Sequence, residues 1–190
     1  FELGYQLRRA WPWLISAVLF VFAFLLTRDA TLAEALYEDF FFNSPFAIAK
    51  TTVTGSLIWL LVAAAVAGEA GARDVASGMY PLTYTSSVRK ADYLGGRFLA
   101  AFVLNAIILL AVQAGILLAV YAPGVDAQLR GPFRPAAYLT SYAFLALPTA
   151  FVATAVQFSV AARRGRPMSA YLGSVLLFFL GFFIAGGLLF

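Results

Sequence analysis

The stretch FLAAFVLNAIILLAVQAGILLAVY, residues Phe98 to Tyr121, has no charged side chain and only two amides, Asn105 and Gln113. A helix needs about 20 apolar residues to cross the hydrocarbon core of a bilayer, so this stretch is long enough. The whole chain has the same character: 63% of its residues are hydrophobic, 12% are charged, and its mean hydropathy is +0.88. These values are typical of integral membrane proteins.

Four further apolar stretches flank this one along the chain. We therefore predict an all-α integral membrane protein, a polytopic helical bundle forming a single transmembrane domain. The predicted spans cover residues 11–27, 45–68, 98–121, 136–162 and 168–190. Ser44 followed by Pro45 predicts the start of the second helix, with a capping hydroxyl and a proline at the first helical position. Pro148 predicts a kink and a freed carbonyl in the fourth.

The distribution of Arg and Lys predicts the orientation, because basic residues in short loops stay preferentially in the cytoplasm. Basic residues predominate before the first span, in residues 69–97, and before the fifth span. We therefore predict a cytoplasmic amino terminus, a cytoplasmic segment at 69–97, and outer loops at 28–44 and 122–135. The acidic first loop carries Phe40 to Phe42 and is either an interfacial segment or a gate or binding surface on the outer face. Because apolar sequence runs to Phe190, we expect the chain to be a piece of a longer protein.

The composition argues against several function classes. The chain has no Cys and no His, which argues against disulfides, thiolate metal sites and His-based catalysis. It lacks a phosphate-binding G-x-x-x-x-G-K-[ST] loop, and its net charge of +4 is too small and scattered to indicate nucleic acid. Apart from Lys50, near the start of the second span, the predicted spans contain no Asp, Glu, Lys or Arg. Carriers coupled to ions or protons usually need such groups.

Polar side chains within the predicted spans have two interpretations. Asn105 and Gln113 fall near one face of the third span, and Thr154 and Gln157 share a face of the fourth. They are either interhelical hydrogen-bonding groups or a weakly polar translocation path. Ser169 and Gly173 form a small-xxx-small pair, which predicts close helix packing against a neighbour in the same chain or in a second subunit.

The cytoplasmic segment EAGARDVASGMYPLTYTSSVRKADYLGGR, residues 69–97, is long for a simple connection. Gly78 and Pro81 break regular structure within it, and SSVRKADYLGGR then resumes helical spacing. This pattern predicts a short amphipathic helix along the membrane surface. One interpretation is an interfacial helix whose basic residues contact lipid phosphates.

The same segment resembles the permease subunit of type-2 ABC exporters. The matching residues are Glu69, Arg73, Asp74, Gly78, Leu82, Thr85, Val88, Lys90, Tyr93, Leu94 and Arg97. The family usually has a proline directly before the valine, whereas this chain has Ser87. A second resemblance, carried by FELGYQLRRAWPW and NSPFAIAK, is to the large bacterial permeases that carry a zinc aminopeptidase-like domain after the membrane part.

The resemblance implies a six-helix permease of the bacterial inner membrane, with its sixth helix beyond Phe190. Such a subunit is not itself an enzyme and holds no cofactor. Its partners would be two copies of an ATPase subunit, which bind ATP and Mg²⁺, and a second permease subunit. The implied ATPase-coupling residues are Arg73, Asp74, Gly78, Thr85, Val88, Arg89, Lys90, Asp92, Tyr93 and Arg97.

Two other functions stay open on the sequence. A non-transporting membrane scaffold would anchor a partner protein and need no ATPase. A membrane enzyme acting on lipids would need clustered Asp, Glu, His or Ser at one interface, whereas the charges here are dispersed among the loops. The transported substrate is not indicated by any motif.

Overall fold

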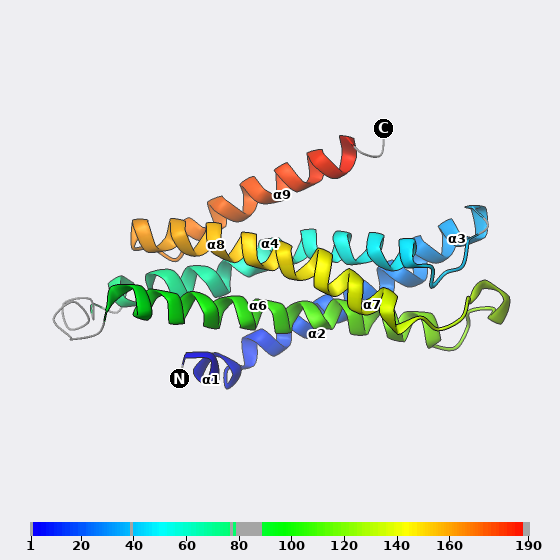
Figure 1. Ribbon diagram of the computed structural model, residues 1–190, viewed down its shortest axis with the longest axis horizontal. Helices are drawn as coiled ribbons and strands as arrows, with labels where there is room; N and C mark the ends of the chain where they lie inside the picture. Colours follow the sequence, from blue (N-terminus) through cyan, green and yellow to red (C-terminus); the bar gives the residue numbers. More distant parts are fainter. Residues whose placement is uncertain (1, 39, 77, 79–88, 188–190) are drawn as a thin grey trace. The chain divides into compact units, whose positions relative to one another are not determined.

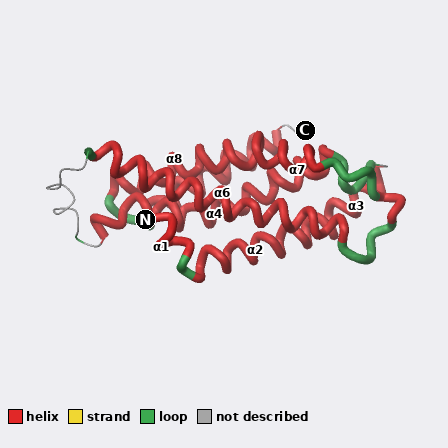
Figure 2. Tube along the Cα trace, turned by 60° about the horizontal axis from the view of Figure 1, so that its bottom comes forward, coloured by secondary structure: helices red, strands yellow, loops and turns green. Residues whose placement is uncertain are grey.

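The computed structural model describes residues 2–38, 40–76, 78 and 89–187, and most of them are helical (Figure 1). Figure 2 shows no strand among these residues. The prediction of an all-α chain is therefore confirmed for the described part. The helices are α1 Glu2–Leu7, α2 Ala10–Leu26, η1 Thr27–Thr31, α3 Leu32–Glu38, α4 Pro45–Ala76, α6 Lys90–Tyr121, η2 Ala127–Leu129, α7 Pro135–Ser141, η3 Tyr142–Ala146, α8 Leu147–Arg164 and α9 Ser169–Gly187.

Four helical stretches in the described residues are long and apolar enough to cross a membrane. They are Ala10–Tyr37, Pro45–Val75, Lys90–Tyr121 and Pro135–Arg164. These stretches contain the first four predicted spans. The described apolar part of α9, Ser169–Ile184, is shorter, and the last three residues of the predicted fifth span lie outside the described residues. The chain thus has the character of a membrane protein, while the number of spans and the side of the amino terminus stay predictions.

Two helix ends differ from the sequence prediction. Residues 28–44 were expected to form an outer loop, but the helix continues through η1 and α3 as far as Glu38. Residues 86–97 were expected to form a short surface helix, but their described helical part, from Lys90 onward, forms the first turns of α6. The physical reason is the same in both places. Charged residues are unfavourable in the apolar core, but they are good helix formers. A change from apolar to charged residues therefore does not by itself begin or end a helix.

The chain divides into two compact units. The first unit comprises Phe1–Arg9, Leu57–Asn105 and Ala150–Phe190, and the second comprises Ala10–Ser56 and Ala106–Thr149. The long helices α4 and α6 contribute residues to both units, since each crosses a unit boundary.

The first unit contains a buried cluster of small residues. Ala64 and Ala72 of α4 pack with Ala161 of α8 and Ala170 of α9 in one buried cluster. A Cβ atom placed on Gly71 would lie only 2.8 Å from the carbonyl oxygen of Phe158, so α4 and α8 approach each other as only glycine allows at this point.

The predicted small-xxx-small pair lies in the same unit. The Ser169 hydroxyl contacts the Val160 carbonyl at 3.3 Å, and a Cβ atom on Gly173 would lie 3.5 Å from Val156. Both neighbours belong to α8, so the pair packs within this chain. The first of the two predicted neighbours, one in the same chain, is therefore present; packing against a second subunit stays a prediction.

The second unit contains a buried cluster made by Ala35, Phe42, Val120 and Val125. Side chains hold its loops together. The Asn43 amide accepts a hydrogen bond from the Gly131 N–H group (2.7 Å) and donates one to the Gly131 carbonyl (2.9 Å). Arg28 and Arg130 both donate to the carbonyl of Ala122, just after α6 ends. Basic side chains at this position satisfy carbonyls that the helix itself leaves unpaired.

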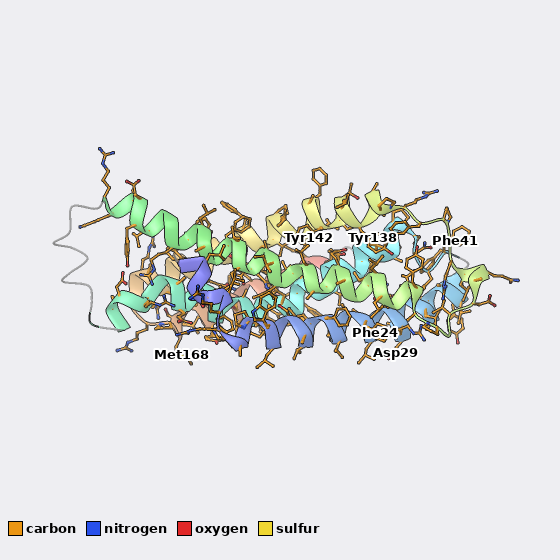
Figure 3. The ribbon with its side chains drawn as sticks, turned by 90° about the horizontal axis from the view of Figure 1, so that it is seen from below. Phe24, Asp29, Phe41, Tyr138, Tyr142 and Met168 are labelled. Carbon is orange, nitrogen blue, oxygen red and sulfur yellow. The ribbon has the colours of Figure 1, made fainter. Side chains whose placement is uncertain are left out.

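Both predicted proline features have a structural counterpart in the second unit. α4 begins at Pro45, and the backbone N–H of Ala47 donates to the Ser44 hydroxyl at 3.2 Å. The π-helical turn η3 precedes Pro148, where an ordinary helix would lose a hydrogen bond to the missing N–H. Figure 3 shows Tyr138 and Tyr142 along this helix, and the Tyr142 hydroxyl donates to the Ala106 carbonyl at 2.7 Å.

Candidate functional site

Charged side chains gather in the first unit where α4 ends and α6 begins. We call this group the charged cluster; its members are Arg9, Glu69, Arg73, Asp74, Tyr93 and Arg97. All except Arg9 belong to the sequence motif described above. Asp74, before Gly78, thus contacts Tyr93 and Arg97, after it. The sequence alone does not predict this contact.

Asp74 is the centre of the more buried half of the cluster. Its Oδ2 atom lies 2.7 Å from Arg97 Nη1, and the Tyr93 hydroxyl donates to both carboxylate oxygens at 2.9 Å. The Arg97 guanidinium also lies 5.5 Å from the centre of the Tyr93 ring. The Arg97 side chain is only 6% exposed and that of Asp74 is 22% exposed. A cation buried to this extent depends on its counter-charge.

Glu69 is the centre of the other half. Its Oε1 atom accepts from Arg9 Nη1 and from Arg73 Nη2, both at 2.8 Å. Arg73 lies four residues after Glu69 on α4, a spacing that places the two side chains on one face. Arg9 comes from the segment that follows α1, so the cluster joins the amino-terminal segment to α4 as well as α4 to α6.

The structure separates the implied coupling residues into two groups. Arg89, Lys90 and Asp92 are exposed, as is Gly78, whose φ of +69° is a left-handed conformation suited to glycine. Arg73, Asp74 and Tyr93 are half-buried, and Arg97 is buried. Thr85 and Val88 lie outside the described residues, as do Leu82 and Ser87. Among the described coupling residues, the first group is thus the more exposed to solvent.

The four candidate translocation residues all form hydrogen bonds between helices. Asn105 Nδ2 donates to Thr154 Oγ1 at 3.0 Å, and Gln157 Nε2 donates to Ser174 Oγ at 2.7 Å. Gln113 Nε2 donates to a hydroxyl on α4 at 2.8 Å. All four side chains are buried. These contacts are those expected of interhelical hydrogen bonds, the first of the two interpretations, and a role in translocation stays a prediction.

Sequence reasoning missed three partners. Thr52 accepts from Gln113, Ser174 accepts from Gln157, and Arg9 pairs with Glu69. Thr52 also donates to the Ile48 carbonyl four residues earlier. Ser and Thr often make such bonds within their own helix, so their presence on a span does not indicate a second helix.

Each unit has a cavity. The one in the first unit has a volume of about 460 Å³ and is lined by Leu3, Asp92, Tyr93, Gly96, Arg97, Leu99, Ala100 and Val103. The one in the second unit has a volume of about 690 Å³ and an apolar lining of Phe20, Ala114, Leu117, Leu118, Tyr121 and Phe133. The first therefore adjoins the charged cluster, whereas the second contacts only hydrocarbon and aromatic side chains.

The described residues contain no group of three or more His, Cys, Asp or Glu that could hold a metal ion. The contacts within the charged cluster are ion pairs and hydrogen bonds among its own side chains. Comparison with protein-family models, with curated proteins and with solved structures found no match to this chain.

Proposed function

We propose that this chain is the membrane-spanning permease subunit of an ATP-driven exporter of the type-2 ABC class. In this proposal residues 69–97 couple it to a separate ATPase subunit, which binds ATP and Mg²⁺. Two ATPase subunits and a second permease subunit complete the transporter in the bacterial inner membrane. The chain itself then supplies the path across the bilayer and catalyses no reaction.

The observation that carries the proposal is the pairing of Asp74 with Tyr93 and Arg97. Asp74 lies in the last turn of α4 and Arg97 in the second turn of α6. Because side chains join the two helices there, a force applied to the segment between them acts on both helices together. ATP binding can drive transport only through contacts that differ between two states of the permease. Because the ion pair joins α4 to α6, a movement of the segment caused by such contacts would move both helices within the membrane.

The exposed residues support the same reading. Arg89 and Lys90 are exposed basic residues at the start of α6, three and two residues before the exposed Asp92. Such a surface suits a complementary charged groove on a partner, since charge complementarity determines which partner binds and in which register.

The experiment uses the protein co-expressed with a candidate P-loop ATPase subunit. The variant Arg89→Glu/Lys90→Glu reverses the exposed charges, and Arg163→Glu/Arg164→Glu makes the same change on the exposed basic pair at the end of α8. We expect the first variant to lose the ATPase on purification and to lose the permease-dependent change in ATP hydrolysis. The control should retain both.

Equal retention of the ATPase by both variants would contradict the coupling role of residues 69–97. A wild-type protein that purifies with no ATPase would favour the alternative, a membrane scaffold that anchors another protein. Thermal unfolding of each variant in detergent shows whether the loss reflects contact or misfolding.

A further inference from the structure

We infer that the connection between α8 and α9 binds the phosphate groups of anionic phospholipids at the membrane surface. We call this connection, Arg163 to Met168, the basic turn. Its three arginines, Arg163, Arg164 and Arg166, lie within four consecutive residues, and all three are exposed. The inference concerns only this part of the first unit and does not depend on the proposed export function.

The charges of the basic turn are not neutralised within the part of the chain that the structure describes. None of its three arginine side chains forms an ion pair or a hydrogen bond with a described residue. Residues 150–190 contain no Asp or Glu. On the neighbouring helix α4, Glu69 and Asp74 are already paired with other arginines. The basic turn therefore offers three positive charges to a ligand from outside the chain.

Local contacts hold the backbone of the basic turn in place. A Cβ atom on Gly165 would lie only 2.9 Å from Val75 Cγ1, so the turn lies directly against α4. The Ser169 hydroxyl donates to the Arg166 carbonyl at 2.6 Å, which joins the turn to the first residue of α9. Because the backbone is already ordered, only the arginine side chains lose conformational freedom when they bind a ligand.

Exposed apolar side chains begin directly after the arginines. Met168, labelled in Figure 3, is 74% exposed, and Leu172 is 60% exposed. The exposure continues along α9 at Val175, Leu176, Phe179 and Leu180. An apolar surface of this extent indicates contact with hydrocarbon rather than water. The arginines therefore lie at the point where the hydrocarbon-facing surface of α9 begins, which is the level of lipid phosphates.

The combination of charge and apolar surface selects the ligand. A guanidinium donates two parallel hydrogen bonds to phosphate oxygens, and basic residues beside a membrane span attract anionic lipids. Phosphatidylglycerol carries a net negative charge, whereas the ammonium group of phosphatidylethanolamine offsets its phosphate. An acidic protein surface would neutralise the arginines but would leave Met168 and Leu172 without an apolar partner. An anionic lipid supplies both the phosphate and the hydrocarbon.

The test is native mass spectrometry of the delipidated protein, without any ATPase, in an equal mixture of phosphatidylglycerol and phosphatidylethanolamine with identical acyl chains. We expect phosphatidylglycerol to be retained with at least about tenfold preference. Equal retention of the two lipids would overturn the inference. No retention would also overturn it and would favour an acidic protein surface as the partner. Displacement by inorganic phosphate at the concentration of the lipid would overturn it too, by showing that free phosphate is the ligand.

Replacing the three arginines locates the site. The variant Arg163→Gln/Arg164→Gln/Arg166→Gln should lower the preference for phosphatidylglycerol to less than about twofold. Thermal unfolding in detergent shows whether this variant is folded. The single change Arg164→Gln affects one exposed side chain and should lower the preference about twofold by itself.

A matched control tests whether the position of the charges matters. It removes three exposed arginines that are dispersed along the chain, Arg8, Arg89 and Arg134, by substitution with glutamine. The control has the same net charge as the first triple variant, so a general effect of charge would be equal in both. We expect the control to keep the preference for phosphatidylglycerol. If the first variant keeps the preference, or both variants lose it equally, the basic turn is not the lipid site.

Discussion

Arg97 Nη1 lies 2.7 Å from Asp74 Oδ2, so an ion pair shielded from water joins the second turn of α6 to the last turn of α4. Tyr93 donates to the same carboxylate and lies under the guanidinium. The three side chains form a small network in which each member has a polar partner. The stability of this end of the first unit should therefore depend on its charges.

The first prediction concerns Asp74. Asp74→Ala leaves the Arg97 cation buried without its counter-charge, and we expect a loss of about 3 kcal/mol in the free energy of unfolding. Denaturant titration in mixed micelles measures this loss. The matched control is Glu34→Ala, which breaks the pair between Glu34 and Lys50, whose side chains are 36% and 41% exposed. It should cost less than about 1 kcal/mol. Equal costs would show that burial of the Asp74–Arg97 pair contributes nothing.

The second prediction concerns the hydrogen bond between Asn105 and Thr154. A double-mutant cycle with Asn105→Leu and Thr154→Val should give a coupling energy of about 0.6 kcal/mol, the average for such bonds inside membranes. A second cycle, pairing Asn105→Leu with Ser174→Ala, serves as control because Ser174 bonds to Gln157 instead. Its two changes should be additive. A coupling energy near zero in the first cycle would show that this hydrogen bond does not stabilise the packing of α6 against α8.

The third prediction concerns the close approach of α4 and α8. A Cβ atom at Gly71 would lie 2.8 Å from the Phe158 carbonyl oxygen and 3.1 Å from Ala161 Cβ. Gly71→Val should therefore destabilise the protein by about 2 kcal/mol through overpacking. Gly95→Val is the control, since nothing lies within 4 Å of a Cβ at Gly95. Thermal melting followed by size-exclusion chromatography should separate the two, and a similar loss in both would contradict the packing.

The fourth prediction concerns Asn43, which is buried and holds the Gly131 backbone through both ends of its amide. Asn43→Ala should speed hydrogen exchange at the Gly131 amide at least about tenfold, because the N–H group loses its acceptor. Gln128→Ala, an exposed change in the same loop, should leave that rate unchanged. Unaltered protection in Asn43→Ala would mean that other contacts position this loop.

The long helices could be predicted because stretches of about 20 apolar residues favour helices that cross a membrane. The residues at which these helices begin and end could not be predicted. Residues 28–38 and 90–97 are polar enough to leave the hydrocarbon, yet they stay helical, since a membrane boundary and a helix end are different physical events. Part of the predicted outer loop and the described part of the predicted surface helix are therefore continuous with long helices, while the side of the membrane on which each lies stays a prediction.

For the candidate site, the motif named the residues but not their burial. The resemblance treats Asp74, Arg89 and Arg97 alike as coupling residues, whereas Arg97 is buried and Arg89 is exposed. Which charges face inward depends on how α4 packs beside α6, and a single sequence does not carry that information. The same limit applies to Thr52 and Ser174, whose partners lie on other helices.

The ion pairs on α4 also indicate the bilayer thickness that this helix matches. Lys50 pairs with Glu34, and Glu69 pairs with Arg9 and Arg73, so charges are fixed near both ends of this helix. Residues 51 to 68 between them carry no charge, and at 1.5 Å per residue they correspond to about 27 Å. This length is close to that of a thin bilayer. Thicker lipids should create hydrophobic mismatch, which the protein would relieve by thinning the membrane around α4, because tilting helps only a helix that is too long.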